Sequence, residues 1–267
     1  MTVLRLDGAI GAGGALRRGL SLDGLAPAIA AAFRPAGLTA VALAINSPGG
    51  APVQSALIAQ RIRDLAAEKK VPVHAFCEDV AASGGYWLAC AGDEIHAMPG
   101  SIVGSIGVVS AGFGFQELIR RHGIERRVHT AGEKKVILDP FQPEDPEDAA
   151  HLERLQQELH AEFIALVKER RGGRLKAGDE TLFDGTFWSG RRAFDLGLVD
   201  GLGEARSVLR GRYGERVRLR PVGPPKSLLR RVLAPGPRAT GGAGLAALPQ
   251  AALATAAEQT LWQRYGL

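Results

Sequence analysis

The fold is organised around residues 79–89, with the sequence DVAASGGYWLA. An apolar run of strand length, residues 71–77, precedes this segment, and the Ala, Leu, Tyr and Trp residues after the glycines favour a helix. Gly84 and Gly85 allow a sharp turn, because glycine adopts dihedral angles and makes close contacts that a side chain would forbid. We therefore predict a buried strand, a tight turn at Ser83 and a helix.

Two interpretations of Ser83 are open at this point. The turn would expose the serine hydroxyl and leave the next N–H, that of Gly84, free at a helix start, which suits a nucleophile. Alternatively, Ser83 is an ordinary helix N-cap followed by glycines.

Apolar runs and helical spacing alternate along the first two thirds of the chain. The expected strands are residues 3–6, 41–45, 71–77, 94–98, 105–110 and 126–130. The expected helices are residues 22–33 (with Ser21 as N-cap), 52–69, 115–122 and 146–171, and a turn is expected at 99–104. Strands that alternate with helices predict an α/β fold with a largely parallel sheet. Because ligands collect at the carboxyl ends of such strands, the turns at Gly49–Gly50 and Ser83 are expected to face one crevice.

The net charge of +5 is concentrated near the C-terminus of the chain. Residues 206–238 contain ten basic residues and one acidic residue, a charge of +9, which leaves −4 for the remainder. A nucleic-acid function of the whole protein is therefore not expected. The helical and strand patterns fade beyond residue 205, so we predict a domain at 1–205, then a basic, Pro/Gly-rich linker and an Ala-rich C-terminal helix at 206–267. Contact of this tail with an acidic partner or a membrane surface is the alternative to a solvated linker.

Other sequence features bear on the compartment of the protein. No apolar run approaches the ~18–20 residues that cross a bilayer, and the N-terminus lacks a signal-peptide core. Cys77 and Cys90 lie in apolar surroundings and form no metal-type pair, as in a reducing compartment. We expect a cytoplasmic protein, with peripheral attachment to the inner membrane as the alternative, and neither a metal site nor a cofactor.

A serine nucleophile requires a base. The six histidines, which include His74 on a strand and His96 in an apolar segment, are each expected to be structural. The alternative base is a lysine that burial keeps neutral, in a Ser-Lys arrangement. Lys134 and Lys135 precede an apolar run and fit this role, although a solvated lysine pair is the simpler interpretation.

Five segments resemble, in order, the signal peptide peptidase A (protease IV) family. They are INSPGG (45–50), AASGGYW (81–87), PGSIVGSIGV (99–108), AGEKK (131–135) followed by DPF (139–141), and WSGRRA (188–193) with GLVD (197–200). The resemblance covers about residues 1–210.

The resemblance implies a Clp/crotonase-like fold of repeated β-β-α units and a serine endopeptidase with a Ser-Lys dyad. The nucleophile falls on Ser83 and the general base on Lys135. Lys134 stands where the family has a tyrosine, and Lys135 is favoured because it holds the position before the apolar run. The oxyanion donors would be the N–H of Gly84 and one from Gly49 or Gly50.

The resemblance further implies how the protein assembles and what it cleaves. Members with a single copy of the domain form rings whose active sites take serine and lysine from neighbouring protomers, so a homo-oligomer is expected. The family commonly has an N-terminal membrane anchor, which is not expected here. The expected substrates are extended, apolar peptides such as signal-peptide remnants.

Two other functions are weighed against the peptidase. A crotonase-like enzyme would bind a CoA thioester and stabilise an enolate in the same glycine-lined hole, but it would need carboxylates near that hole. A catalytically inactive assembly module would use the ring and the basic tail to dock a partner.

Overall fold

The computed structural model describes residues 1–11, 19–132, 134–222, 256 and 258–267. The chain divides into two compact units: unit 1 comprises residues 1–106 and 164–267, and unit 2 comprises residues 107–163.

Unit 1 is built on a sheet whose main path runs β6-β5-β3-β2-β1-β8, with β4 pairing β3 and β7 pairing β4. The strands are β1 (Thr2–Asp7), β2 (Val41–Ser47), β3 (Val73–Ala82), β4 (Glu94–Ala97), β5 (Ile102–Gly104), β6 (Phe187–Ser189), β7 (Gly201–Leu202) and β8 (Arg220–Val222). All pairs are parallel except β5 with β6. The expected α/β fold with a largely parallel sheet is therefore confirmed.

Strand β3 is the branch point of this sheet. Its first half, residues 74–77, pairs with β4, whereas its last residues, 80–82, pair with β5. Glu78 and Asp79 pair with neither, and the register against β2 also shifts between Ile45 and Ser47. The strand therefore runs past the expected end at residue 77 and delivers the chain to Ser83.

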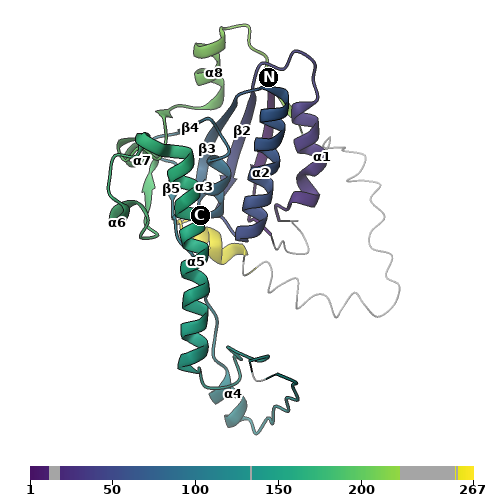
Figure 1. Cartoon of the computed structure of the whole chain (residues 1–267), viewed down its shortest axis with the longest axis vertical. Helices are drawn as coiled ribbons and strands as arrows, with labels where there is room; N and C mark the ends of the chain where they lie inside the picture. The colour runs from purple at the N-terminus through teal and green to yellow at the C-terminus, as the bar shows by residue number, and fades with distance from the viewer. Residues whose placement is uncertain (12–18, 133, 223–255, 257) are drawn as a thin grey trace, which may run out of the picture. The chain divides into compact units, whose positions relative to one another are not determined.

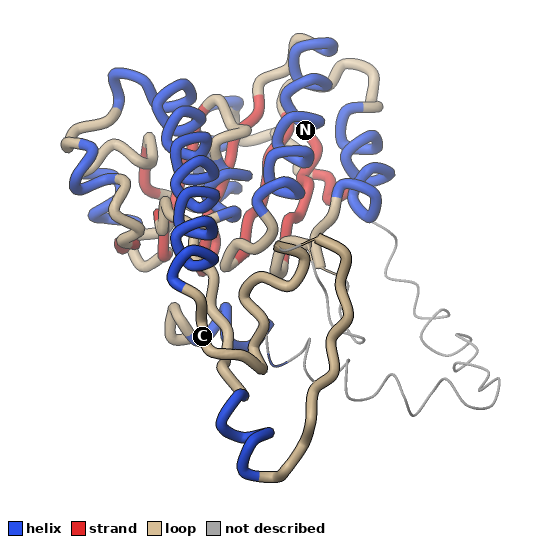
Figure 2. The backbone as a smooth tube through the Cα atoms, turned by 60° about the horizontal axis from the view of Figure 1, so that its bottom comes forward, coloured by secondary structure: helices blue, strands red, loops and turns tan. Residues whose placement is uncertain are grey.

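Helices cover the sheet of unit 1. Helices α1 (Leu22–Phe33) and α2 (Pro52–Lys69) lie side by side against one face (Figures 1 and 2). The Ser21 hydroxyl accepts a hydrogen bond from the Gly24 N–H at 3.2 Å, so the expected N-cap is confirmed. The shorter helices of the unit are α3 (Gly84–Ala89), α6 (Asp179–Leu182), α7 (Gly190–Asp195), α8 (Ala205–Tyr213) and the 3₁₀ turn at Gly172–Arg174. The apolar side chains Leu4, Leu43, Ile45, Ile58 and Ile62 are fully buried, as the helical and strand spacing predicts.

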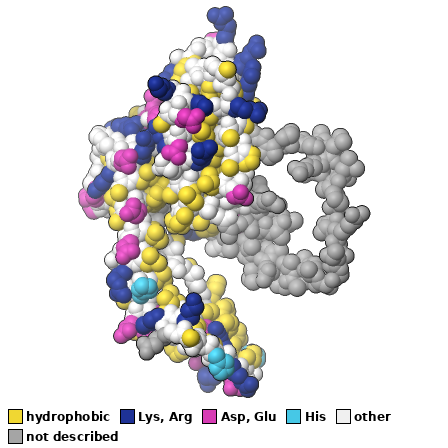
Figure 3. Space-filling model, turned by 45° about the vertical axis from the view of Figure 1, so that its right-hand side comes forward, with side chains coloured by type: hydrophobic (Ala, Val, Ile, Leu, Met, Phe, Trp, Pro, Cys, Tyr) yellow, Lys and Arg dark blue, Asp and Glu magenta, His cyan; other side chains and the backbone are white. Residues whose placement is uncertain are grey.

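Unit 2 has little core of its own. It contains α4 (Gln116–Arg121) and the first part of α5 (Pro146–Arg171), a helix whose bounds match the sequence expectation and whose last residues belong to unit 1. Among the described residues of unit 2, only Phe163 is buried. Large apolar side chains are instead exposed: Val109, Phe113, Phe115, Leu118, Ile124, Val128, Phe141 and Leu155. Figure 3 shows hydrophobic side chains on the surface of the molecule among the charged ones.

Three local expectations were wrong. Residues 105–110 and 126–130 form no strand, because neither segment has a strand beside it among the described residues, and residues 126–130 are exposed throughout. The turn expected at residues 99–104 ends in β5, which β3 and β6 hold on either side.

Residues 205–222 form more regular structure than a linker would. They contain α8 and β8, and β8 extends the sheet beside β1. Residues 223–255 and 257 of the expected linker and C-terminal helix lie outside the described residues, whereas residues 258–263 are helical. In the described part of the chain, no helix combines the length and apolar character needed to cross a membrane.

Candidate active site

Ser83 adopts a strained backbone conformation at the turn from β3 to α3. Its φ of 54° and ψ of −124° lie in a region that residues with a side chain rarely occupy. Such a conformation costs roughly 1–3 kcal/mol and persists only where the surroundings impose it. A serine on a sharp strand-to-helix turn of this kind has its hydroxyl exposed, as in a nucleophile elbow.

The hydroxyl of Ser83 is not used to cap the helix. Its side chain makes no cap hydrogen bond, and the Ser83 carbonyl instead accepts from the N–H groups of Tyr86 and Trp87, at 2.9 and 3.1 Å. The N–H of Ser83 donates to the Gly104 carbonyl at 2.8 Å, which ties the turn to β5. The N-cap interpretation of Ser83 is therefore wrong.

Glycines surround Ser83 because side chains would not fit there. A Cβ at Gly49 would lie 2.7 Å from the Ser83 Cβ and 2.9 Å from the Gly84 nitrogen. A Cβ at Gly50, where φ is 140°, would clash with the Ile10 carbonyl, and one at Gly84 would lie 2.5 Å from the Ser55 Oγ. The turn after β2 and the turn after β3 are thus in direct contact, as the sequence predicts for two strand ends in a parallel sheet.

Two N–H groups at this contact have no partner in the part of the chain that the structure describes. Among the described residues, neither the Gly50 N–H nor the Gly84 N–H donates a hydrogen bond. The Gly49 N–H, by contrast, donates to the Ser47 hydroxyl at 3.3 Å. Between the two glycines that the sequence left open, Gly50 is therefore the one with a free donor.

The two lysines lie in a turn of unit 2, and both are exposed. Lys134 bonds the carboxylates of Asp148 and Glu147, at 3.1 and 3.3 Å. These hydrogen bonds, the one to Asp148 first, raise the pKa of Lys134 above its ordinary value. Lys134 is therefore held as a cation and is a poor general base. The Lys135 N–H donates to the Gly132 carbonyl at 3.2 Å, which shapes the turn without engaging the Lys135 side chain.

Ser83 and Lys135 belong to different units, Ser83 to unit 1 and Lys135 to unit 2. The burial expected to keep a catalytic lysine neutral is not provided to Lys135 by the described residues of this chain.

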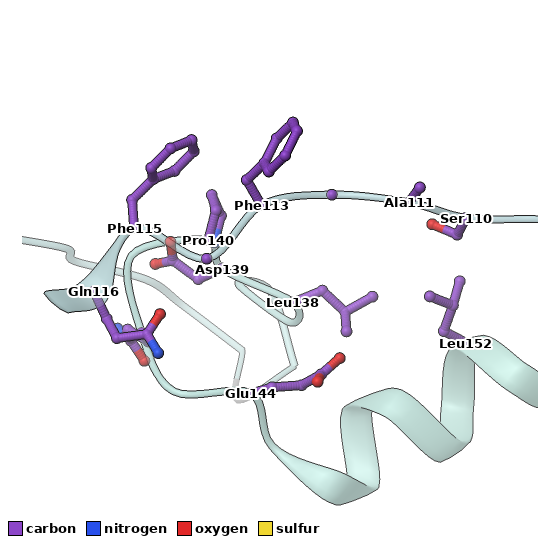
Figure 4. Close-up of a pocket in the computed structure, with 13 residues that line it drawn as sticks. Ser110, Ala111, Phe113, Phe115, Gln116, Leu138, Asp139, Pro140, Glu144 and Leu152 are labelled. Carbon is purple, nitrogen blue, oxygen red and sulfur yellow. The ribbon is translucent and has the colours of Figure 1, made fainter. Parts of the chain in front are cut away.

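Unit 2 contains a cavity of about 630 Å³ beside the lysine turn. Its lining includes Ser110, Phe113, Leu138, Asp139 and Leu152. Figure 4 shows the rings of Phe113 and Phe115 pointing the same way, away from the helix that carries Leu152. Both carboxylate oxygens of Asp139 accept hydrogen bonds from the Arg126 guanidinium, at 2.8 and 2.7 Å, so this carboxylate is already paired within unit 2.

The two cysteines are excluded as nucleophiles. Cys77 and Cys90 are free and buried. Burial raises the pKa of both thiols to about 12, so neither is a thiolate at neutral pH.

The C-terminal motif, residues 188–200, is structural. A Cβ at Gly190 would clash with the Met98 carbonyl, and the Ser189 hydroxyl caps α7 by accepting from the Arg192 N–H at 3.3 Å. Asp200 accepts hydrogen bonds from the Ile95 N–H at 2.7 Å and from the buried guanidinium of Arg171 at 2.7 and 2.9 Å. This motif holds the edge of the sheet in place. The sequence patterns did not identify Arg171 as the partner of Asp200.

The fold and the site together define an α/β protein with a nucleophile-type serine turn at the carboxyl end of a parallel strand. The sequence pattern of peptidase family S49 matches residues 65–212, more than half of the chain. The chain belongs to peptidase family S49, and the resemblance to signal peptide peptidase A is confirmed.

A named serine protease, a solved structure and a longer bacterial protein are among the proteins that this chain resembles. The serine protease SPPA of the Arabidopsis thaliana chloroplast is 34% identical over 165 residues, 61% of this chain and 24% of that protein. A mutant of the 1510-N membrane-bound stomatin-specific protease has a similar fold, with a TM-score of 0.52 at 17% identity over 84% of this chain and 97% of the other. A Brucella abortus protein named Na⁺/H⁺ antiporter NhaA is 56% identical over 272 residues. That match covers 99% of this chain, which therefore spans only 36% of the length of the Brucella protein.

Proposed function

We propose that this chain is a serine endopeptidase that uses Ser83 as nucleophile and Lys135 as general base, in a Clp/crotonase-like variant of the α/β fold. The observation that carries the proposal is the conformation of Ser83. The Ser83 backbone is strained and its hydroxyl caps no helix. Beside it lie two glycine N–H groups without partners among the described residues. This is the arrangement expected of a nucleophile and its oxyanion hole. Membership of peptidase family S49 supports the same reaction class.

The reaction follows from the roles of these groups. The Ser83 Oγ attacks the peptide carbonyl while neutral Lys135 Nζ takes the hydroxyl proton, and the lysine then returns that proton to the leaving amine. The N–H groups of Gly84 and Gly50 stabilise the oxyanion, because both are unpaired and backbone contacts fix both. Water then hydrolyses the acyl-enzyme, with the same lysine as base.

The exposure of Lys135 supports a homo-oligomer with shared active sites. A lysine acts as base only when it is desolvated enough to lose its proton, and the described residues of one chain leave Lys135 in water. The exposed apolar side chains of unit 2 are a surface that a second copy would cover. In the proposed assembly, a neighbouring protomer buries the lysine turn and supplies the serine.

The proposed substrates are extended, apolar peptides such as signal-peptide remnants. The Gly49–Gly50 turn and the Ser83 turn are in contact at the carboxyl ends of β2 and β3. A peptide whose carbonyl reaches Ser83 would therefore lie across the two turns, and an extended chain can do so more readily than a folded one. The proposal includes a cytoplasmic location, with peripheral membrane contact through the basic residues beyond 206 as the alternative.

Covalent labelling tests the nucleophile. A fluorophosphonate probe should label the wild-type protein once, at Ser83, and should not label Ser83→Ala. Lys135→Ala should label far more slowly, whereas the matched control Lys134→Gln should label like wild type. An adduct on another residue would refute the assignment, and turnover of an acyl-CoA in place of peptides would favour the crotonase-like alternative. A folded wild-type oligomer that neither labels nor cleaves would favour the inactive module.

Subunit mixing tests the shared site. Ser83→Ala and Lys135→Ala, each inactive, should recover part of the activity after subunit exchange, because mixed interfaces contain one intact serine and one intact lysine. If confirmed exchange restores nothing, each site takes both residues from the same chain.

A further inference from the structure

Three side chains with metal-ligating atoms meet at the end of the sheet opposite Ser83. His74 lies on β3, and Glu94 and His96 lie on β4, with one ligand atom from each within 4.8 Å of the others. Helix α8 lies over this part of the sheet, where its Leu209 joins the buried cluster around Phe76. The His74 side chain is 2% exposed, and the His96 ring stacks on Phe76 with centroids 5.3 Å apart.

The nitrogen of His74 that faces this cluster has no hydrogen bond. The Nδ1 atoms of His74 and His96 are both buried without a partner among the described residues. The His74 Nδ1 is the one that lies in the cluster, 3.6 Å from the Glu94 Oε2. An unsatisfied buried polar atom costs roughly 1–3 kcal/mol, so such an atom in a folded core calls for a ligand.

Two of the three donor spacings are close to those around a tetrahedral ion. Zn²⁺ binds imidazole nitrogen and carboxylate oxygen at about 2.0–2.2 Å, so neighbouring ligands of one ion lie about 3.3 Å apart. The Glu94 Oε2 is 3.4 Å from the His96 Nε2, and 3.6 Å from the His74 Nδ1. The other nitrogen of His96 faces Gly201, where a Cβ would come within 2.8 Å, so Nε2 is its accessible ligand atom.

The residues around the cluster would orient such ligands. A metal-bound histidine usually donates its second N–H to an oxygen, which fixes the ring. The His74 Nε2 lies 2.9 Å from the hydroxyl of Tyr213 on α8. Arg212, also on α8, forms an ion pair with the Glu94 Oε2, so its guanidinium occupies the side of the carboxylate that a metal cation would otherwise approach. The Arg212 side chain is 47% exposed, so it can move into solvent when a metal cation takes its place.

We propose that His74, Glu94 and His96 form a binding site for a divalent transition-metal ion of the Zn²⁺ type, with water as the fourth ligand. The ligand set of two imidazoles and one carboxylate suits zinc and leaves one position open. The metal would fix α8 against β3 and β4 through Tyr213. His74 precedes Ser83 by nine residues, about 30 Å of extended strand, so the ion takes no part in peptide cleavage. The proposal replaces the expectation of two purely structural histidines and no metal site.

Zinc titration of the 267-residue chain tests the site. After treatment with a chelator, the protein should bind one Zn²⁺ by calorimetry, and Zn²⁺ should raise its melting temperature. His96→Gln and Glu94→Gln should each weaken binding at least about 100-fold, and Tyr213→Phe about 10- to 100-fold. The exposed His129 is the matched control, and His129→Asn should bind Zn²⁺ like wild type. Ser83→Ala should also bind normally, which separates this site from the proposed peptidase.

Arg212→Met gives a test that does not depend on losing a buried group. Removing the competing guanidinium should tighten Zn²⁺ binding about 10-fold or more, since the Glu94 carboxylate is then free. A cluster that is only an ion pair would show no metal binding in either protein. The proposal is overturned if the folded wild type and Arg212→Met bind no Zn²⁺, or if Glu94→Gln and His129→Asn bind it equally.

Discussion

Unit 1 and unit 2 hold the two proposed catalytic side chains in opposite ways. Ser83 is held in a strained conformation in unit 1, where its N–H donates to the Gly104 carbonyl and where Gly49 approaches so closely that a Cβ there would lie 2.7 Å from the Ser83 Cβ. Lys135 sits in an exposed turn of a unit in which Phe163 is the single buried residue among those described. The comparison teaches that one chain already holds the proposed nucleophile and the proposed oxyanion donors in place, whereas the proposed base would need burial by groups outside the described residues of the chain. The predictions below test each side of this contrast.

The largest effect is expected at the preorganised side. Ser83→Ala should lower the peptide-hydrolysis rate on the order of 10⁵- to 10⁶-fold, the loss typical of a catalytic serine, and leave the circular dichroism spectrum unchanged. Steady-state hydrolysis of an apolar peptide measures the loss. Residual activity within 100-fold of wild type would mean that unit 1 does not carry the nucleophile.

A smaller loss, about 10²- to 10⁴-fold, is expected at the exposed side. Lys135→Arg should be as inactive as Lys135→Ala, because arginine cannot give up its proton. Lys134→Gln should keep most activity, since its carboxylate partners hold Lys134 as a cation. Hydrolysis rates of the three variants measure this, and the reverse pattern would assign the base to Lys134.

The contrast in burial predicts different stability losses for two ion pairs. Asp200→Asn breaks the pair with the buried Arg171, whose side chain is 1% exposed, and should cost about 3–5 kcal/mol of unfolding free energy. Glu147→Gln, which breaks the exposed pair with Lys134, should leave the denaturation midpoint unchanged. Urea unfolding of both variants compares the units directly. Equal losses would remove the contrast.

The same Asp200 carboxylate predicts a pH dependence. Burial acts to raise its pKa, but the hydrogen bonds from Arg171 and from the Ile95 N–H outweigh burial, so the pKa lies below the ordinary value of 3.8. The stabilisation is therefore complete above pH 3.8 and is lost as the pH falls further. Asp200→Asn should flatten this acid limb of the stability curve, and an unchanged limb would assign it to other carboxylates.

The smallest expected effect is a difference in stability between two Ser83 variants, which tests whether the Ser83 backbone is strained. Ser83→Gly should be more stable than Ser83→Ala by about 1 kcal/mol, because glycine accepts a φ of 54° without cost while alanine retains the strain. Both variants should be inactive. Thermal unfolding of the pair measures the difference, and equal stability would mean that the turn is relaxed.

Most helices and strands of unit 1 could be predicted from the sequence. The apolar runs of β1 to β4, the Ser21 cap and the helical spacing of α2 and α5 are local signals, and the glycines around Ser83 marked its turn. Signals that depend on distant partners were missed. The three residues of β5 become a strand only because β3 and β6 lie beside them, and residues 126–130 lack such neighbours.

The sequence also identified which residues belong to the candidate site better than it predicted their hydrogen bonds and their exposure. Ser83, Gly50 and Gly84 follow from strand-end turns, but the absence of a cap and the free N–H of Gly50 could be seen only in three dimensions. The preference for Lys135 over Lys134 rested on one position in a motif. The carboxylates that hold Lys134 come from α5, 13 and 14 residues away, which no local pattern reveals.

Strand β3, which pairs with β4 along its first half and with β5 at its end, also affects how the protein unfolds locally. Residues 74–77 are hydrogen-bonded to β4 and residues 80–82 to β5, while Glu78 and Asp79 pair with neither. The break divides the strand into a segment that carries His74 and a segment that leads to Ser83. Amide protons on the two sides of the break should therefore exchange with deuterium as two cooperative groups. Zinc should slow the exchange of the first group, and an acyl adduct on Ser83 should slow the second.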